Sequence, residues 1–467
     1  MNTLELARLQ FGITTVFHFI FVPMSIGLAV WVAYCQTRWL RSRDEVWLRM
    51  TRFWGKLMLL SIAVGVVTGI VQEFQFGMNW SVYSRYVGDV FGAPLAMEGL
   101  AAFFLESTFV GLWIFGWGRI SPRLHLMAAW LTAIGTALSA YFILAANSWM
   151  QHPVGYKLDP VTHHAVLTNI FAVLFNSTVL LAFPHTIFGA FTTAGALVLG
   201  ISMWYLVRGR NADVFRRSAR LVLPITLVTA IATGVFGDSQ ARLMDSQQPM
   251  KMAAAEALYN SSHHACFSLF ATAGFTRHPQ NLSYDLCIPD GLSLLATLNP
   301  DGLVKGINQV NAAERRKYGP GDYVPIVGVT YWSFRIMSGI GVLLILLPLA
   351  GMLLARRGRL ERSRWYYRAA LVGIFLPILA NWSGWIFTEM GRQPWVVYGL
   401  LKTSQARSPD VSAASIAISL AAYVVLYGVL IAIGGKLFVR EIKHGPQEPP
   451  ADGDEPGGAA HDLLLAY

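Results

Sequence analysis

The stretch NWSGWIFTEMGRQPW, residues 381–395, ends a long apolar segment with a carboxylate, Glu389, and a guanidinium, Arg392. Three tryptophans surround these charges, and tryptophan is enriched where a membrane helix meets water. Ionisable residues in a spanning helix are costly and mark functional paths by default. The stretch therefore predicts a membrane helix that carries a polar site near one of its ends.

Composition and segment lengths indicate an all-α integral membrane protein. The chain of 467 residues is 54% apolar and only 13% charged, with a mean hydropathy of +0.47. Soluble domains carry about 25% charged residues. A bilayer core about 30 Å thick takes about 20 apolar residues, and a helix satisfies its own backbone polar groups. Nine such segments are expected, at residues 12–36, 55–75, 94–117, 124–146, 179–206, 219–240, 327–354, 369–389 and 412–438.

The net charge of +10 reports membrane topology, and we expect no nucleic-acid partner. Lys and Arg gather in alternate connections: Arg38 to Lys56, Arg119 and Arg123, Arg208 to Arg220, Arg356 to Arg368, and Lys436 to Lys443. This pattern predicts the N-terminus outside and the C-terminus inside. The expected organisation is helices one to six in 1–240, an outer loop at 241–326, helices seven to nine in 327–440, and a disordered cytoplasmic tail at 441–467.

The three cysteines fall on both sides of the predicted membrane. Cys35 lies at the inner end of the first segment, whereas Cys266 and Cys287 lie in the outer loop. An oxidising outer location favours a disulfide between the latter two, worth about 3 kcal/mol by the chain-entropy model. Two unrelated free thiols remain the alternative. No CxxCH motif occurs, so a covalently attached c-type haem is not indicated.

Several chemistry-bearing side chains share one predicted depth. Counting from the basic inner cap of each helix at 1.5 Å per residue places five of them about 30 Å from the inner face. A histidine there can simply hydrogen-bond across helices, a methionine can simply pack, and Glu389 with Arg392 can be an interfacial ion pair. The shared depth favours a common site. The five are His18, Glu98, His185, Met337 and Glu389, while Glu106 lies about 10 Å deeper.

Histidine and methionine together suit haem iron. His/Met axial ligation gives a low-spin electron-transfer centre, whereas a glutamate or a lone histidine leaves a position open for oxygen. Arg8, Arg335 and Arg392 are candidates to pair with haem propionates. Residue chemistry alone therefore predicts a multi-haem membrane redox protein with its sites near the outer face.

The outer loop offers a second candidate site. The stretch DSQQPMKMAAAEALYN, residues 245–260, carries Lys251 and Glu256 just after the sixth segment. The two side chains could bind and deprotonate a quinol hydroxyl, or they could belong to a solvated amphipathic turn. The residues alone leave both possibilities open.

Six motifs in order resemble subunit I of the cytochrome bd quinol oxidases, in the form with a short outer loop. The resemblance runs from ARLQFG at 7–12 through GRQPW at 391–395 and the ninth helix. The motifs are LARLQFGITTVFHF, MEGLAAFFLESTF, NSWMQHPVGY, PMKMAAAEA, YWSFRIMSG and GWIFTEMGRQPW. The short loop and the Cys266–Cys287 pair depart from the general pattern, which leaves the quinone head group open.

The resemblance implies a role for each candidate residue. His185 and Met337 match the axial ligands of a low-spin b haem. His18 and Glu389 match the ligands of two high-spin haems, one b-type and one haem d. The remaining matches are Glu98 and Glu106 on an inner proton route, Lys251 and Glu256 at the quinol site, and Trp385 and Arg392 beside the haems.

The resemblance also implies an activity and partners. Quinol is oxidised at the outer face and oxygen is reduced to water with protons from the cytoplasm, which generates a proton-motive force. A second large subunit and one or more single-helix subunits are expected, in a bacterial cytoplasmic (inner) membrane. Two alternatives are an ion-coupled transporter, which would place its polar residues at the midplane of repeated helices, and a haem-bearing anchor for a quinone dehydrogenase.

Overall fold

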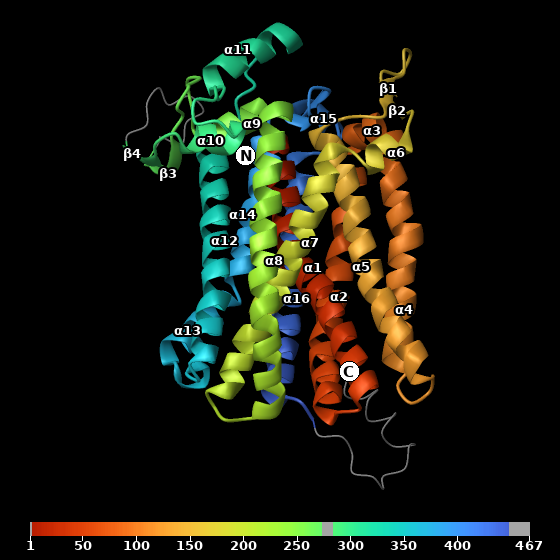
Figure 1. The fold of residues 1–467 in the computed structure, drawn as a ribbon. Helices are drawn as coiled ribbons and strands as arrows, with labels where there is room; N and C mark the ends of the chain where they lie inside the picture. Colours follow the sequence, from red (N-terminus) through yellow and green to blue (C-terminus); the bar gives the residue numbers. More distant parts are fainter. Residues whose placement is uncertain (1, 273–283, 448–467) are drawn as a thin grey trace.

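Long apolar helices form the body of the protein. The structure is a computed structural model that describes residues 2–272 and 284–447. Within these ranges nine helices are long and apolar enough to cross a membrane, and they run side by side in one elongated bundle (Figure 1). The prediction of nine spanning helices is confirmed.

The helices extend beyond the predicted apolar segments because polar turns continue them past the apolar core. They are α1 (Thr3–Ser42), α2 (Glu45–Met78), α3 (Ser81–Met97) continued by η1 (Glu98–Phe103) and α4 (Phe104–Phe115), α5 (Pro122–Gln151), α7 (Ser177–Leu206), α8 (Ala212–Gln247), α12 (Val327–Arg356), α13 (Arg364–Gly373) continued by α14 (Leu376–Gly391), and α16 (Ala413–His444).

Short elements connect the spanning helices. The helical ones are α6 (Ile170–Leu174), α9 (Pro249–Ala255), α10 (Gly291–Thr297), α11 (Ile307–Tyr318), a 3₁₀ turn η2 (Leu360–Arg362) and α15 (Thr403–Ala406). In the described part of the chain three antiparallel strand pairs occur: β1 (Tyr156–Leu158) with β2 (Ala165–Leu167), β3 (Phe267–Thr272) with β4 (Tyr284–Ile288), and β5 (Trp395–Val397) with β6 (Leu401–Lys402).

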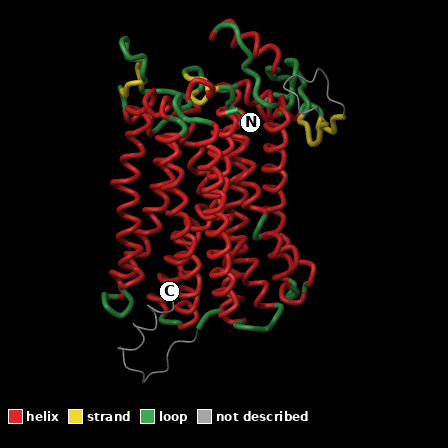
Figure 2. The backbone as a smooth tube through the Cα atoms, turned by 180° about the vertical axis from the view of Figure 1, so that it is seen from behind, coloured by secondary structure: helices red, strands yellow, loops and turns green. Residues whose placement is uncertain are grey.

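Most of these connecting elements lie at one end of the bundle, so its two ends differ. The three strand pairs lie at the same end as α9, α10 and α11, as the strands in Figure 2 show, and the N-terminus lies there too. We call this the α9–α11 end. The helix α16 runs toward the opposite end (Figure 1). The predicted disordered tail, 441–467, begins inside α16, and from residue 448 it lies outside the described residues.

Local sequence explains where several helices begin. Asn2 and Glu5 form a reciprocal capping box at the start of α1, and Ser121 caps α5 with Pro122 in its first turn. The third span is interrupted by η1, a π-helical turn that starts at Glu98. Such turns often occur at functional sites because they turn a side chain out of the regular helical register.

The largest apolar core fills the half of the bundle away from α9–α11. It draws on the second halves of α1 and α7 and the first halves of α2 and α8. Trp54 and Phe215 are fully buried there, and Tyr205 stacks on Phe215 with ring centroids 3.9 Å apart. Large apolar side chains therefore occupy this half, and the polar candidate residues lie toward the other.

Candidate functional site

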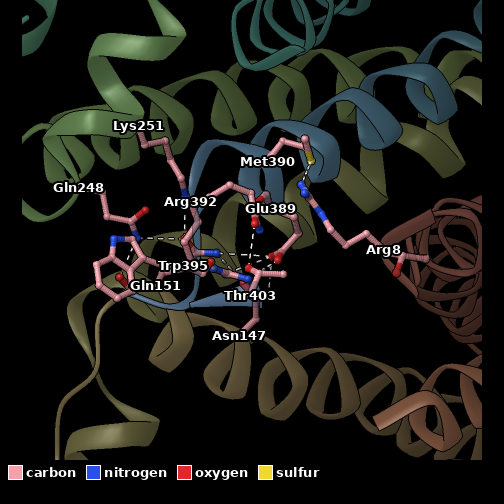
Figure 3. Close-up of polar contacts among 12 residues, drawn as sticks. Arg8, Asn147, Gln151, Gln248, Lys251, Glu389, Met390, Arg392, Trp395 and Thr403 are labelled. Carbon is pink, nitrogen blue, oxygen red and sulfur yellow. Dashed lines mark hydrogen bonds and ion pairs between the residues drawn. The ribbon is translucent and has the colours of Figure 1, made fainter. Parts of the chain in front are cut away.

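Glu389 is the centre of a polar cluster at the α9–α11 end (Figure 3), and its own side chain is 27% exposed. Its carboxylate pairs with Arg392, whose guanidinium follows one turn later and is only 3% exposed. Asn147 Nδ2 of α5 donates to Glu389 Oε1 at 2.9 Å, and Gln151 Nε2 lies 3.5 Å from the same oxygen. Arg392 Nε also donates to the Trp395 carbonyl at 3.3 Å. The carboxylate of the opening motif is therefore held by α5 and by its own helix end.

Lys251 reaches the same cluster from α9. Its Nζ donates to Gln151 Oε1 at 2.7 Å, and Gln248 Nε2 donates to that oxygen at 3.0 Å. A Cβ at Gly391 would lie 2.8 Å from Lys251 Cγ, so glycine at this position lets the lysine chain pass close to α14. Burial lowers the pKa of Lys251 to about 7, and the positive charge of Arg392 acts in the same direction. The lysine can therefore change its charge near neutral pH.

Glu256 and Arg335 form a second buried ion pair. Glu256 is the C-terminal cap residue of α9, and its side chain is 1% exposed. The side chain of Arg335, on α12, is 7% exposed. Burial raises the pKa of Glu256, although Arg335 opposes the shift. The guanidinium of Arg335 lies over the rings of Phe267 and Tyr331, each 4.8 Å from the centroid. Lys251 and Glu256 are thus buried, which contradicts the alternative of a solvated turn.

His18 is oriented by a threonine of α2. Its Nδ1 lies 2.8 Å from Thr68 Oγ1, and that hydroxyl lies within 3.0 Å of the carbonyls of Val64 and Gly65. When this hydroxyl donates to one of the two carbonyls, it accepts from His18 Nδ1, and Nε2 keeps the lone pair. A Cβ at Gly69 would lie 3.2 Å from His18 Cε1. A fixed tautomer of this kind is the usual preparation of a histidine for a metal.

His185 repeats this arrangement on α7. Its Nδ1 lies 2.9 Å from the Thr233 carbonyl of α8, which can only accept, so Nε2 again carries the lone pair. A Cβ at Gly237 would lie 3.2 Å from His185 Cε1. Met337 of α12 also faces a glycine, because a Cβ at Gly384 would lie 3.0 Å from its sulfur. Three of the four predicted iron ligands, His18, His185 and Met337, therefore lie against a glycine.

The two predicted proton-route carboxylates lie along the third span. Glu98 begins the π-helical turn and accepts a hydrogen bond of 2.6 Å from Ser139 of α5. Glu106 lies in the first turn of α4, where a Cβ at Gly135 would come within 3.1 Å of its backbone. Both side chains therefore lie beside α5, separated by about two helical turns.

The other predicted site residues have separate positions. Trp385 of α14 packs on Phe19, the neighbour of His18, with ring centroids 4.7 Å apart. Arg8 of α1 directs Nη2 to the Met390 sulfur at 3.5 Å, next to Glu389 (Figure 3). Cys266 and Cys287 are joined by a disulfide across β3 and β4, which confirms that prediction.

The predicted iron ligands fit haem better than they fit a metal ion bound by protein side chains alone. In residues 2–272 and 284–447 no group of three or more His, Cys, Asp or Glu side chains could hold a metal. A porphyrin supplies four nitrogens, so single axial ligands suffice. Buried donors without a hydrogen-bond partner in these ranges include Arg335 Nε, Trp382 Nε1 and Trp395 Nε1. Such donors are rare in proteins and suit acidic groups such as propionates.

A comparison with known proteins decides the family. The model for cytochrome bd terminal oxidase subunit I matches residues 6–446. The chain belongs to this family. Members are subunits of quinol oxidases, so the chain is an oxidoreductase subunit and a multi-pass bacterial membrane protein. The cytochrome bd family implies haem cofactors, a quinol substrate and a complex with a second subunit.

Relatives and a solved structure agree over nearly the full length. The chain is 47% identical to cytochrome bd ubiquinol oxidase subunit 1 of Bacillus subtilis (strain 168), over 96% of this chain and 95% of the relative. It is 35% identical to the bd-II subunit 1 of Escherichia coli (strain K12), over 95% and 97%. The bd oxidase structure from Geobacillus thermodenitrificans matches with a TM-score of 0.86 and 27% identity, covering 95% of this chain and 99% of that one.

The sequence analysis did not identify the neutral residues that link Lys251 to Glu389 by hydrogen bonds. Gln151, Asn147 and Gln248 carry most of the hydrogen bonds between α5, α9 and α14. The only signal for two of them was their place in the motif NSWMQHPVGY. Glu314 of α11 was also missed: it is 6% exposed and accepts a hydrogen bond of 3.1 Å from Tyr398.

Proposed function

We propose that the chain oxidises quinol at the α9–α11 end, which faces the outside of the bacterial cytoplasmic membrane. The positive-inside distribution of Lys and Arg supports this orientation. Lys251 and Glu256 bind the quinol head group, the lysine by donating to an oxygen and the glutamate by accepting a hydroxyl proton. The buried Arg335 keeps Glu256 available as a carboxylate.

We propose three haems: a low-spin b haem on His185 and Met337, and a high-spin b haem and a haem d on His18 and Glu389. Haem held by these residues would supply the electron-transfer and oxygen-binding chemistry between quinol and oxygen. Thr68 and Thr233 hold the two imidazoles so that Nε2 is the free nitrogen. The expected partners of the propionates are Arg8, Arg335 and Arg392, and Trp385 packs beside the His18 segment.

The protons consumed with oxygen reach the site from the cytoplasm along the third span. Glu106 lies deeper in the bundle than Glu98, so a proton reaches Glu106 first and Glu98 second. Ser139 orients the Glu98 carboxylate. Because quinol protons leave outward and oxygen takes protons from inside, charge is separated without a pump. One or more single-helix subunits complete the assembly beside the second large subunit.

The hydrogen-bonded connection Lys251–Gln151–Glu389 carries this proposal. The side-chain amide of Gln151 joins Lys251, the candidate quinol-binding residue, to Glu389, the candidate iron ligand of α14. Neither a transporter nor a haem-bearing anchor requires that connection.

The test is a reduced-minus-oxidised spectrum of the purified complex and of a Met337→Leu variant. We expect b-type bands and the red-shifted chlorin band, and we expect the variant to lose or convert only the low-spin component. A colourless protein would favour the transporter, and b bands alone would favour the anchor. An unchanged spectrum in the variant would refute the His185–Met337 pair.

A further inference from the structure

An open surface cavity of about 620 Å³ is lined by residues at the end of α1 and at the starts of α2 and α8. These helix ends lie at the end of the bundle opposite α9–α11 (Figure 1). Four arginines and two aspartates line the cavity: Arg38, Arg216, Arg217, Arg220, Asp44 and Asp213. None of these residues has a part in the oxidase chemistry proposed above.

Three ion pairs neutralise part of the lining. Arg217 Nη1 lies 2.5 Å from Asp44 Oδ2, and the pairing lowers the pKa of Asp44. Arg216 pairs with Glu361 of η2 at 2.5 Å. Asp213 is neutralised from the other side by Arg49 at 2.6 Å.

Two guanidiniums remain without an ion pair, although the charge of Arg220 acts on the Glu361 carboxylate at longer range. Within the described ranges neither Arg38 nor Arg220 forms an ion pair, so the cavity keeps about two positive charges. Arg38 lies over the ring of Trp47, 5.2 Å from its centroid, and Arg217 lies over the same ring at 5.2 Å. Stacking on an aromatic face fixes a guanidinium and leaves its edge donors free for an anion.

We propose that this cavity binds the phosphate group of an anionic phospholipid. The guanidinium fork matches phosphate oxygens with two parallel hydrogen bonds. Leu221 adds an aliphatic side chain to the lining, which an acyl-linked head group contacts and a free phosphate does not need. The cavity also lies where α1 ends at Ser42 and α2 begins at Glu45, at the limit of two spans. Basic pockets between spanning helices bind lipid head groups at this level.

The test uses the complete haem-loaded complex in nanodiscs of phosphatidylcholine with one-fifth phosphatidylglycerol. Native mass spectrometry counts the anionic lipids retained after mild delipidation. Each arginine near a membrane surface contributes about 1 kcal/mol, so each loss weakens retention about fivefold. The double variant Arg38→Gln/Arg220→Gln is expected to lose about 25-fold, and Arg38→Lys/Arg220→Lys to lose less.

A matched control removes the same charge at the same end of the bundle. Arg119→Gln/Arg123→Gln changes two exposed arginines outside the cavity, and retention is expected to stay at the wild-type level. Equal loss in both double variants would overturn the site, because charge alone would then explain retention. Inorganic phosphate at 10 mM is expected not to displace the lipid; displacement would assign the cavity to a soluble phosphate compound. Density for a partner subunit inside the cavity would also overturn the proposal. The haem spectrum of each variant reports folding separately, so failure here leaves the oxidase proposal intact.

Discussion

Replacing Gln151 by leucine tests the connection between the quinol candidate and the haem-ligand candidate. In the wild type, Lys251 Nζ has Gln151 Oε1 as its hydrogen-bond partner among the described residues, at 2.7 Å. A hydrogen bond to a charged group contributes about 1.5–3 kcal/mol, and one pKa unit corresponds to about 1.4 kcal/mol. The substitution therefore moves the pKa of Lys251 from about 7 down by roughly one to two units.

The pKa of Lys251 falls because the lost hydrogen bond stabilised its charged, protonated form. Removing the acceptor disfavours the ammonium, so the protonated share of Lys251 at pH 7 falls from about one-half to between about 1% and 10%. If the ammonium donates to quinol, the KM for quinol rises about five- to fiftyfold at pH 7. Below pH 5 the variant recovers its affinity, because the lysine is charged again. The value of kcat at saturating quinol changes less.

The assay is oxygen consumption against quinol concentration from pH 4.5 to 9, with the haem spectrum as a folding control. Gln248→Leu is the matched variant: it removes two hydrogen bonds to Gln151 but leaves the bond from Lys251. It should lower stability without moving the pH profile. A wild-type KM profile in Gln151→Leu, or the same displacement in both variants, would refute the reasoning.

Three further predictions concern other parts of the chain. Glu106→Gln should lower turnover at least tenfold while the haem spectrum stays intact, and full turnover would remove Glu106 from the proton route. Burial raises the pKa of Glu314 to about 7, so ionising this buried carboxyl destabilises α11 as the pH rises from about 4.5 through 7. The Glu314→Gln variant should therefore stabilise α11 by about 2 kcal/mol at pH 8 and leave its stability unchanged at pH 4. Hydrogen exchange of the α11 amides measures the difference. Replacing Cys266 and Cys287 by serine should lower the free energy of unfolding of the loop by about 3 kcal/mol. Limited proteolysis should then be faster in the variant than in the wild type under non-reducing conditions, and equally fast after reduction.

The spanning helices were predictable because each carries a long apolar run. The structure differs from the prediction at their ends, at the π-helical turn in the third span and at the break between α13 and α14. The prediction stops α1 at residue 36, yet the helix continues to Ser42, because polar residues beyond the apolar core keep their backbone hydrogen bonds. The disulfide followed from the charge pattern, which placed both cysteines on one side. The strand pairs and the π-helical turn at Glu98 were missed, since short elements at helix ends lack a periodic signal.

The polar cluster was predictable only where its members are neighbours in sequence. Glu389 and Arg392 are three residues apart, so one helical turn brings them together. Asn147 and Gln151 reach the same carboxylate from positions 242 and 238 residues away. Their contact depends on how α5 and α14 are rotated against each other, which no single-chain pattern specifies.

The glycines opposite the predicted ligands explain why the site lies at one end of the bundle. Gly69, Gly237 and Gly384 look ordinary in sequence, yet each faces His18, His185 or Met337 on a neighbouring helix. A ligand side chain needs a fixed hydrogen bond or contact on one side and open space on the other. Toward the opposite end, that space is filled by side chains such as Trp54 and Phe215, both fully buried. Glycines thus lie against the predicted ligands in one half of the bundle, whereas large apolar side chains pack in the other half.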